Sequence, residues 1–375
     1  MRFVADSGLW TTGPTAAPAP LTAVLELAGA VLSWPVDRSD ADMKTVVRLT
    51  VTDIARADWL WRVVGENGHA AIVAALAADV GAVGERDVPD VGFLTGALDP
   101  LWRLALGHWL QRWWPASRRD GIAELDGALL GGELAVLTAA AEDFFGDGTL
   151  DSEVPALLRP HMAALAAARQ DGDRRIVDLV EACAELAEDT GLGPSDGLVP
   201  ATARRRDDYA LAAGAAGVDS SGAGIASGVR SLSWAGVPPG VFDAAENTID
   251  WRIAADGAAV RAVLGVELAG AGESGVSPQG IAVSVRSAAL RGAGELDDAG
   301  RARLELVDDA NVPVAESVAW KHDWRDLRIT VGVGVDESAE IRDRVRAVAR
   351  ARLRRANAPG GDAYLAEVLA AESDY

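Results

Sequence analysis

The spacing of apolar residues changes once along this chain of 375 residues, and the change separates two kinds of structure. From about residue 20 to 190, apolar residues recur every three or four positions, the period of a helix that buries one face. From about residue 229 onward they alternate with polar residues, the period of a half-buried strand. We therefore expect an α+β protein with an N-terminal mainly helical domain and a C-terminal antiparallel β-sandwich-like domain with terminal helices.

The composition also changes between these two patterns. Residues 191–228 are rich in glycine, alanine and serine, which indicates a linker or a long irregular connection. The predicted division is a tryptophan-rich, mainly helical domain over 1–190, the linker over 191–228, and a β-sandwich-like domain over 229–375 that ends in an arginine-rich helix.

Individual elements follow from the same periods. The clearest helix is expected to be capped by Asp99, to carry Pro100 in its first turn and to end before Pro115. Residues 45–52 are β-branched and alternate, which favours a strand within the helical half. Other helices are predicted near 53–64, 67–80, 121–130, 132–145, 153–169, 172–189, 337–356 and 362–372. Strands are predicted at 229–234, 249–253, 259–268, 281–285, 302–306 and 327–333.

The charge of the chain limits its partners. It carries 56 acidic and 35 basic side chains, a formal net charge of −21. Residues 1–200 hold 15 basic and 30 acidic side chains, a net charge of −15, and the remainder holds 20 and 26, a net charge of −6. Such a field repels phosphate backbones and anionic lipids, so we expect neither nucleic acid nor a membrane as a partner.

Cysteine use and the apolar segments indicate a compartment. Cys183 is the only cysteine, so an intramolecular disulfide or a cysteine-based zinc site cannot form. Prolines interrupt the uncharged residues 7–25, and no apolar run is long enough to span a membrane. We expect a cytoplasmic protein.

Motifs of common catalytic sites are missing or stand in the wrong context. Neither Lys44 nor Lys321 follows a glycine, which argues against a P-loop. Residues 270–275 match GxGxxG, but a strand follows them, so a hairpin turn is the better interpretation. His322 beside Asp323 is the strongest acid–base candidate, although adjacent residues of a strand point to opposite faces. We assign no catalytic residue, no metal site and no cofactor.

Tryptophans and arginines form the most informative patterns. Tryptophans at helical spacing on 101–114 predict a core stripe, and any exposed member would be a partner site. The helix expected at 337–356 has a narrow apolar stripe surrounded by arginines, which indicates a solvated face or a docking surface for an acidic partner or for this chain's own acidic half. Nucleic acid is the third alternative, which the lack of an accompanying aromatic platform or glycine-rich loop disfavours. We hypothesise that it packs against the acidic half of this chain. The candidate interaction residues are Trp102, Trp109, Trp113, Trp114, Arg342, Arg346, Arg350 and Arg354.

These patterns favour a non-catalytic protein-interaction protein, an adaptor or accessory subunit of a bacterial multiprotein system. The alternative is a hydrolase or transferase with a histidine-containing site between the two halves, using His108 or His322. A deep pocket with a histidine, a carboxylate and a nucleophile would favour the enzyme, and an exposed tryptophan patch would favour the adaptor.

Overall fold

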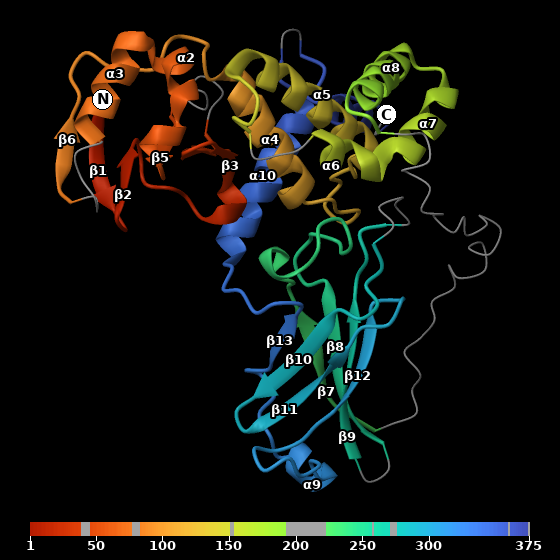
Figure 1. Cartoon of the computed structure of the whole chain (residues 1–375). Coiled ribbons are helices and arrows are strands. Elements are labelled where there is room, and N and C mark those ends of the chain that lie inside the picture. The colour runs from red at the N-terminus through yellow and green to blue at the C-terminus, as the bar shows by residue number, and fades with distance from the viewer. Residues whose placement is uncertain are drawn as a thin grey trace. The chain divides into compact units, whose positions relative to one another are not determined.

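Figure 1 shows the computed structural model of the protein, which describes residues 1–38, 46–76, 83–150, 154–192, 223–256, 259–270, 276–358 and 361–373. The chain forms two compact units. The first unit contains Met1–Trp114, Leu125–Leu198 and Glu340–Tyr375, and the second contains Pro115–Glu124 and Val199–Ala339. The C-terminal residues therefore belong to the same unit as the N-terminus.

This division differs from the predicted boundaries of 1–190 and 229–375. Residues 115–124 belong to the second unit, and the arginine-rich helix expected at the end of the β domain belongs to the first. Residues 193–222, most of the predicted linker 191–228, lie outside the described residues, and residues 223–228 are part of a strand.

The described residues of the first unit include an antiparallel sheet of six strands in the order β3-β4-β5-β2-β1-β6. A mainly helical N-terminal domain is therefore wrong for residues 1–51, whereas β5 confirms the strand predicted at 45–52. The alternation in β3 is hard to see in the sequence because the apolar Val24 occupies an exposed position, 42% accessible. The strands are β1 (Arg2–Asp6), β2 (Leu9–Thr12), β3 (Thr22–Leu27), β4 (Ala30–Pro35), β5 (Arg48–Val51) and β6 (Glu85–Asp87).

Helices complete the first unit. Helix α4 packs against β3, and the ring of Trp102 meets that of Trp34 edge-on with centroids 5.9 Å apart. The two helices predicted at 121–130 and 132–145 are one helix, α5, because the side chain of Asp126 accepts hydrogen bonds from Ala128 N and Leu129 N and starts it there. The described helices are α2 (Trp61–Val64), α3 (Glu66–Leu76), α4 (Asp99–Trp113), α5 (Gly127–Phe145), α6 (Val154–Leu158), α7 (Met162–Ala168), α8 (Arg174–Asp189), α10 (Ala339–Arg355) and α11 (Leu365–Ser373).

A buried ion pair joins the last two helices. Arg352 of α10 donates two hydrogen bonds to the carboxylate of Glu367 on α11, at 2.6 and 2.8 Å. The two residues are 6% and 0% exposed. The neighbouring Tyr364 hydroxyl donates to the carbonyl of Arg103, and Leu365 N donates to the carboxylate of Glu133 at 2.7 Å. The C-terminal helix is thereby bonded to both α4 and α5.

The second unit consists mainly of two antiparallel sheets within its described residues, one of three strands in the order β11-β10-β13 and one of four in the order β12-β9-β8-β7. Buried and exposed residues alternate along β9 and β10, which agrees with the predicted period of two. The strand β11 was not predicted. The elements are β7 (Ala223–Arg230), β8 (Ile249–Asp256), β9 (Ala259–Val266), β10 (Ala282–Ser287), β11 (Leu290–Glu295), β12 (Arg301–Glu305), α9 (Glu316–Ala319) and β13 (Arg328–Val331).

The buried ion pair gives a prediction for stability. Replacing Glu367 with alanine leaves the guanidinium of Arg352 buried without its main partner, which costs about 3–5 kcal/mol in the free energy of unfolding. Chemical denaturation monitored by tryptophan fluorescence measures this loss. The control is Glu372→Ala on the same helix, whose exposed carboxylate pairs with Arg175 and should change the stability little. Equal effects of the two substitutions would contradict the prediction.

Candidate anion-binding site

The tryptophans predicted as interaction residues lie on α4. Trp102 and Trp109 are 1% and 2% exposed and belong to the core, which leaves them no surface for a partner. Their indole N–H groups donate to Asp362 and to the carbonyl of Pro20. Trp113 and Trp114 are half-buried, and the Arg112 guanidinium lies 4.2 Å from the ring centroid of Trp113.

The predicted arginines lie on α10. Arg344 of this helix donates to Asp37 through Nε at 2.9 Å, so the helix is bonded to the N-terminal part of the first unit, in line with the hypothesis of docking onto the acidic half. The four arginines named as interaction residues range from buried to exposed: Arg342 and Arg346 are buried, Arg350 is half-buried and Arg354 is exposed. Only Arg354 is therefore fully available to a partner in solution.

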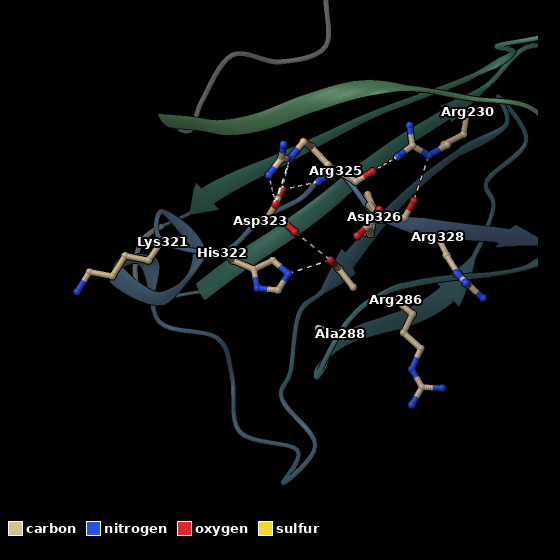
Figure 2. Close-up of a pocket in the computed structure, with 11 residues that line it drawn as sticks. Arg230, Arg286, Ala288, Lys321, His322, Asp323, Arg325, Asp326 and Arg328 are labelled. Atoms are coloured by element: carbon tan, nitrogen blue, oxygen red, sulfur yellow. Dashed lines mark hydrogen bonds and ion pairs between the residues drawn. The ribbon is translucent and has the colours of Figure 1, made fainter.

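The second unit has an open pocket of about 1060 Å³ (Figure 2). It is lined by the ends of β7 and β10, the start of β13 and residues 321–327, which follow α9. Basic side chains dominate its wall, in contrast to the net charge of the whole chain. The charged or titratable residues of the lining are Arg230, Arg286, Lys321, His322, Asp323, Arg325, Asp326 and Arg328.

Some of these charged side chains hold the loop 321–327 in place. Arg230 donates to the carbonyls of Arg325 and Leu327, at 2.7 and 3.1 Å. Asp323 accepts hydrogen bonds from the side chain and from the backbone N–H of Arg325, and these lower the pKa of Asp323 to about 2. Asp323 is therefore ionised at neutral pH and already paired.

Ser287 and His322 form a contact that the sequence did not reveal. Ser287 Oγ lies 2.8 Å from His322 Nε2, and the histidine ring lies edge-on to Trp324 with centroids 4.5 Å apart. A serine and a histidine at this distance are the groups of nucleophilic catalysis. However, Ser287 is only 3% exposed, and the predicted partner Asp323 binds Arg325. The contact therefore supports the fold of the loop better than it supports catalysis.

The other titratable candidates are also buried in part. His108 lies on α4 in the first unit, where burial lowers its pKa. Burial raises the pKa of the Cys183 thiol to about 11, which keeps it protonated and weakly nucleophilic. In the described parts of the chain, no group of three or more histidine, cysteine or acidic side chains is placed to hold a metal ion.

The most unusual charges of the pocket are two arginines on adjacent strands. Arg286 of β10 pairs in register with Arg328 of β13 and, on its other side, with Arg291 of β11. Side chains directly opposite in antiparallel strands share one face with Cβ atoms about 4.5–5.5 Å apart, and like charges there are destabilising. We call Arg291, Arg286 and Arg328 the arginine row. All three residues are exposed.

The members of the arginine row differ in their partners. Arg291 donates to the side chain of Asn311 at 2.7 Å. Within the residues that the structure describes, no carboxylate lies within ion-pair distance of Arg286 or Arg328, and Figure 2 shows both side chains extending away from the loop without a bonded neighbour. Sequence reasoning missed this pair because the register of two strands, not a motif, brings residues 286 and 328 together.

A scan against protein-family models, a search of curated proteins and a search of solved structures each found no match to this chain. No helix among the described residues has the length and apolar character needed to cross a membrane. The assignment of a function therefore depends on the geometry of the site.

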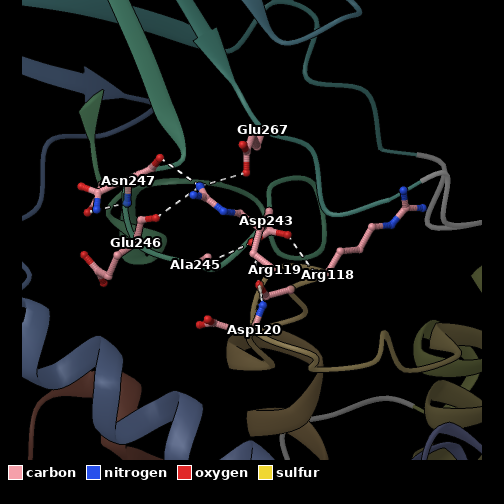
Figure 3. A network of polar contacts seen from close by, with 10 residues as sticks. Arg118, Arg119, Asp120, Asp243, Ala245, Glu246, Asn247 and Glu267 are labelled. Carbon is pink, nitrogen blue, oxygen red and sulfur yellow. Dashed lines mark hydrogen bonds and ion pairs between the residues drawn. The ribbon is translucent and has the colours of Figure 1, made fainter. Parts of the chain in front are cut away.

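A second polar cluster in this unit is structural (Figure 3). Asp243 is 2% exposed and accepts hydrogen bonds from Ser117 Oγ, Arg118 N and Ala245 N, at 2.7, 2.9 and 2.8 Å. Arg119 also donates to the carbonyl of Asn247 at 3.1 Å. These bonds fix residues 115–124 to the rest of the second unit.

The Asp243 cluster predicts a loss of stability on a nearly isosteric change. In Asp243→Asn the amide nitrogen cannot accept a hydrogen bond, so at least one of the three donors loses its partner, at a cost of about 1–3 kcal/mol in the free energy of unfolding. Differential scanning calorimetry of this variant and of Asp309→Asn, an exposed carboxylate in the same unit, provides the comparison. A variant at position 243 as stable as the wild type would show that the cluster is not stabilising.

For the arginine row we expect a substitution to increase stability rather than reduce it. Arg286→Gln removes the repulsion from its two opposed neighbours, so the melting temperature of the unliganded protein should rise slightly in low salt. The gain should shrink in high salt, because ions screen exposed charges. Melting curves at two ionic strengths test this, with Arg354→Gln on α10 as the control for loss of one exposed positive charge. A lower melting temperature for Arg286→Gln would show that the guanidinium stabilises the unliganded fold.

Proposed function

We propose that this protein is a non-catalytic adaptor or accessory subunit of a bacterial multiprotein system that acts in the cytoplasm. Its second unit binds an anionic segment of a partner protein at the arginine row and the adjoining pocket. The observation that carries this proposal is the direct opposition of Arg286 and Arg328 with no carboxylate paired to either in the described structure. An anionic ligand would remove the repulsion that the free protein bears.

The surroundings of the pocket support a polypeptide as the ligand. Trp320 and Val318 are 53% and 50% exposed, and Lys321 of the pocket lining directly follows Trp320. The indole N–H of Trp320 donates to the Glu316 carboxylate at 3.1 Å, which orients the exposed ring. Exposed aromatic and arginine side chains are enriched in protein interfaces, where they carry much of the binding energy. A partner segment with acidic and apolar side chains fits both features.

A histidine-dependent hydrolase or transferase is the second candidate. The distance of 2.8 Å between Ser287 Oγ and His322 Nε2 favours it. Both residues belong to the second unit, so this version of the enzyme needs no residue of the first. The buried hydroxyl and the engagement of Asp323 by Arg325 weigh against it.

The proposal is tested by reversing the charge of the site. We expect the double variant Arg286→Glu/Arg328→Glu to lose a partner that the wild-type protein captures, because two repulsions replace two attractions. Quantitative mass spectrometry of crosslinked complexes compares it with Arg159→Glu/Arg174→Glu, which makes the same change in net charge on exposed positions of the first unit.

The location of the crosslinks decides the outcome. Support requires a partner that is lost only in the first variant and is crosslinked near residues 321–328 through an acidic segment. The same set of partners for the wild type and both variants would refute the proposal.

A further inference from the structure

The exposed face of the β11-β10-β13 sheet carries a second polar row beside the arginine row. Ser284 of β10 stands directly opposite Thr330 of β13, just as Arg286 stands opposite Arg328. Residues two apart on a strand share a face and lie about 6.6 Å apart. Two residues with hydroxyl groups therefore neighbour the two arginines on the same face of the sheet. Ser284 is exposed and Thr330 is half-buried.

Acidic residues near these rows do not neutralise them. Glu295 of β11 is opposite Ala282, which lies two positions before Ser284 on β10 and four before Arg286. Asp326 lines the pocket close to Arg328 in sequence, but within the described structure it forms no ion pair with Arg286 or Arg328. The face thus offers the three positive charges of the arginine row to a ligand, and two of them, on Arg286 and Arg328, have no bonded neighbour in the described structure.

The number of positive charges and hydrogen-bond donors on this face indicates whether a carboxylate or a phosphoryl group fits it better. A carboxylate has one negative charge and two oxygens, which a single guanidinium fork satisfies. A phosphate monoester carries a charge of about −1.5 to −2 at neutral pH and has three terminal oxygens, so it accepts bonds from two arginines and a hydroxyl at once. Two arginines whose Cβ atoms are about 5 Å apart match the larger group.

We infer that the arginine row is a clamp for a phosphoryl group, formed by Arg286 and Arg328 with the Ser284 and Thr330 hydroxyls, and that the group is carried by a phosphorylated side chain of the partner. This inference depends on the proposed function, because it names the ligand of the same site. The exposed Trp320 next to Lys321 provides a contact for residues that flank the phosphorylated one. A nucleic-acid backbone fits less well, because each phosphodiester carries one charge and the net charge of −21 opposes the approach of a polyanion.

The test uses the full chain and three pools of fluorescent peptides of mixed sequence, each with one fixed central residue: phosphoserine, glutamate or serine. Fluorescence polarisation in low salt measures the affinity. We expect the phosphoserine pool to bind roughly tenfold more tightly than the glutamate pool, and serine to bind weakest. Inorganic phosphate should compete only weakly, because it lacks the flanking residues.

Two matched variants connect the binding to the site. Arg286→Gln should weaken binding of the phosphoserine pool roughly tenfold, whereas Arg159→Gln, at an exposed position of the first unit, should leave it unchanged. Melting curves establish that both variants are folded. A phosphoserine pool that binds no better than the glutamate pool, or that binds Arg286→Gln as well as the wild type, would overturn the phosphoryl clamp.

These outcomes are separate from those of the proposed function. Equal binding of the glutamate and phosphoserine pools, with loss of both in Arg286→Gln, overturns the clamp and leaves a site for acidic segments. Binding of inorganic phosphate as tight as that of the phosphoserine pool also overturns the inference, because it makes a small phosphate the ligand. The proposed adaptor function is tested separately, by comparing the partners captured with the wild type and with Arg286→Glu/Arg328→Glu.

Discussion

The buried pairing of Arg352 with Glu367 fixes how this chain is organised. The first unit is built from the two ends of the chain, and the second unit is formed mainly by residues between them. Such an arrangement requires the returning segment to bind firmly, and the ion pair, together with the Tyr364 hydrogen bond to Arg103, supplies that attachment. Because a charge left alone in the interior is costly, the ion pair stabilises the packing of the two helices that carry it.

The remaining arginines show how unusual the proposed site is. In a chain with 56 acidic residues, a surface arginine has many potential partners. In the first unit Arg344 forms an ion pair with Asp37, and Arg175 forms ion pairs with both Asp173 and Glu372. Arg286 and Arg328 instead face each other across adjacent strands. Like charges placed in register with no internal counterion are the arrangement expected where the counterion belongs to another molecule.

The sequence predicted elements better than it predicted their assembly. The helix expected at 172–189 is α8, Arg174–Asp189, because Asp173 is a visible cap and Ile176, Val180 and Cys183 recur on one buried face. The strands β3 and β4 were not predicted. Their period of two is hard to recognise because exposed positions on these strands are also apolar. The unit to which α10 belongs depends on partners such as Asp37, which lie about 300 residues away and leave no local trace.

The candidate site was less predictable than the fold for the same reason. Tryptophans and an arginine-rich helix were the clearest features of the sequence. In the structure, however, Trp102, Trp109 and Arg346 are buried. The residues that define the arginine row are ordinary exposed positions of three strands, and only the register makes them neighbours. No property of either segment alone distinguishes Arg286 or Arg328 from the other arginines of the chain.

The contact between Ser287 and His322 orders the backbone of the proposed site. Ser287 ends β10 next to Arg286, and His322 follows Lys321 in the loop, so their hydrogen bond ties the strand that carries one cation to the loop that carries another. Arg230 fixes the far end of the same loop through two backbone carbonyls. A ligand then binds to groups whose backbone is already ordered, and less conformational entropy is lost on binding. Under the function proposed above, the histidine acts as a positioning residue, because its hydrogen bond to Ser287 holds the loop against β10.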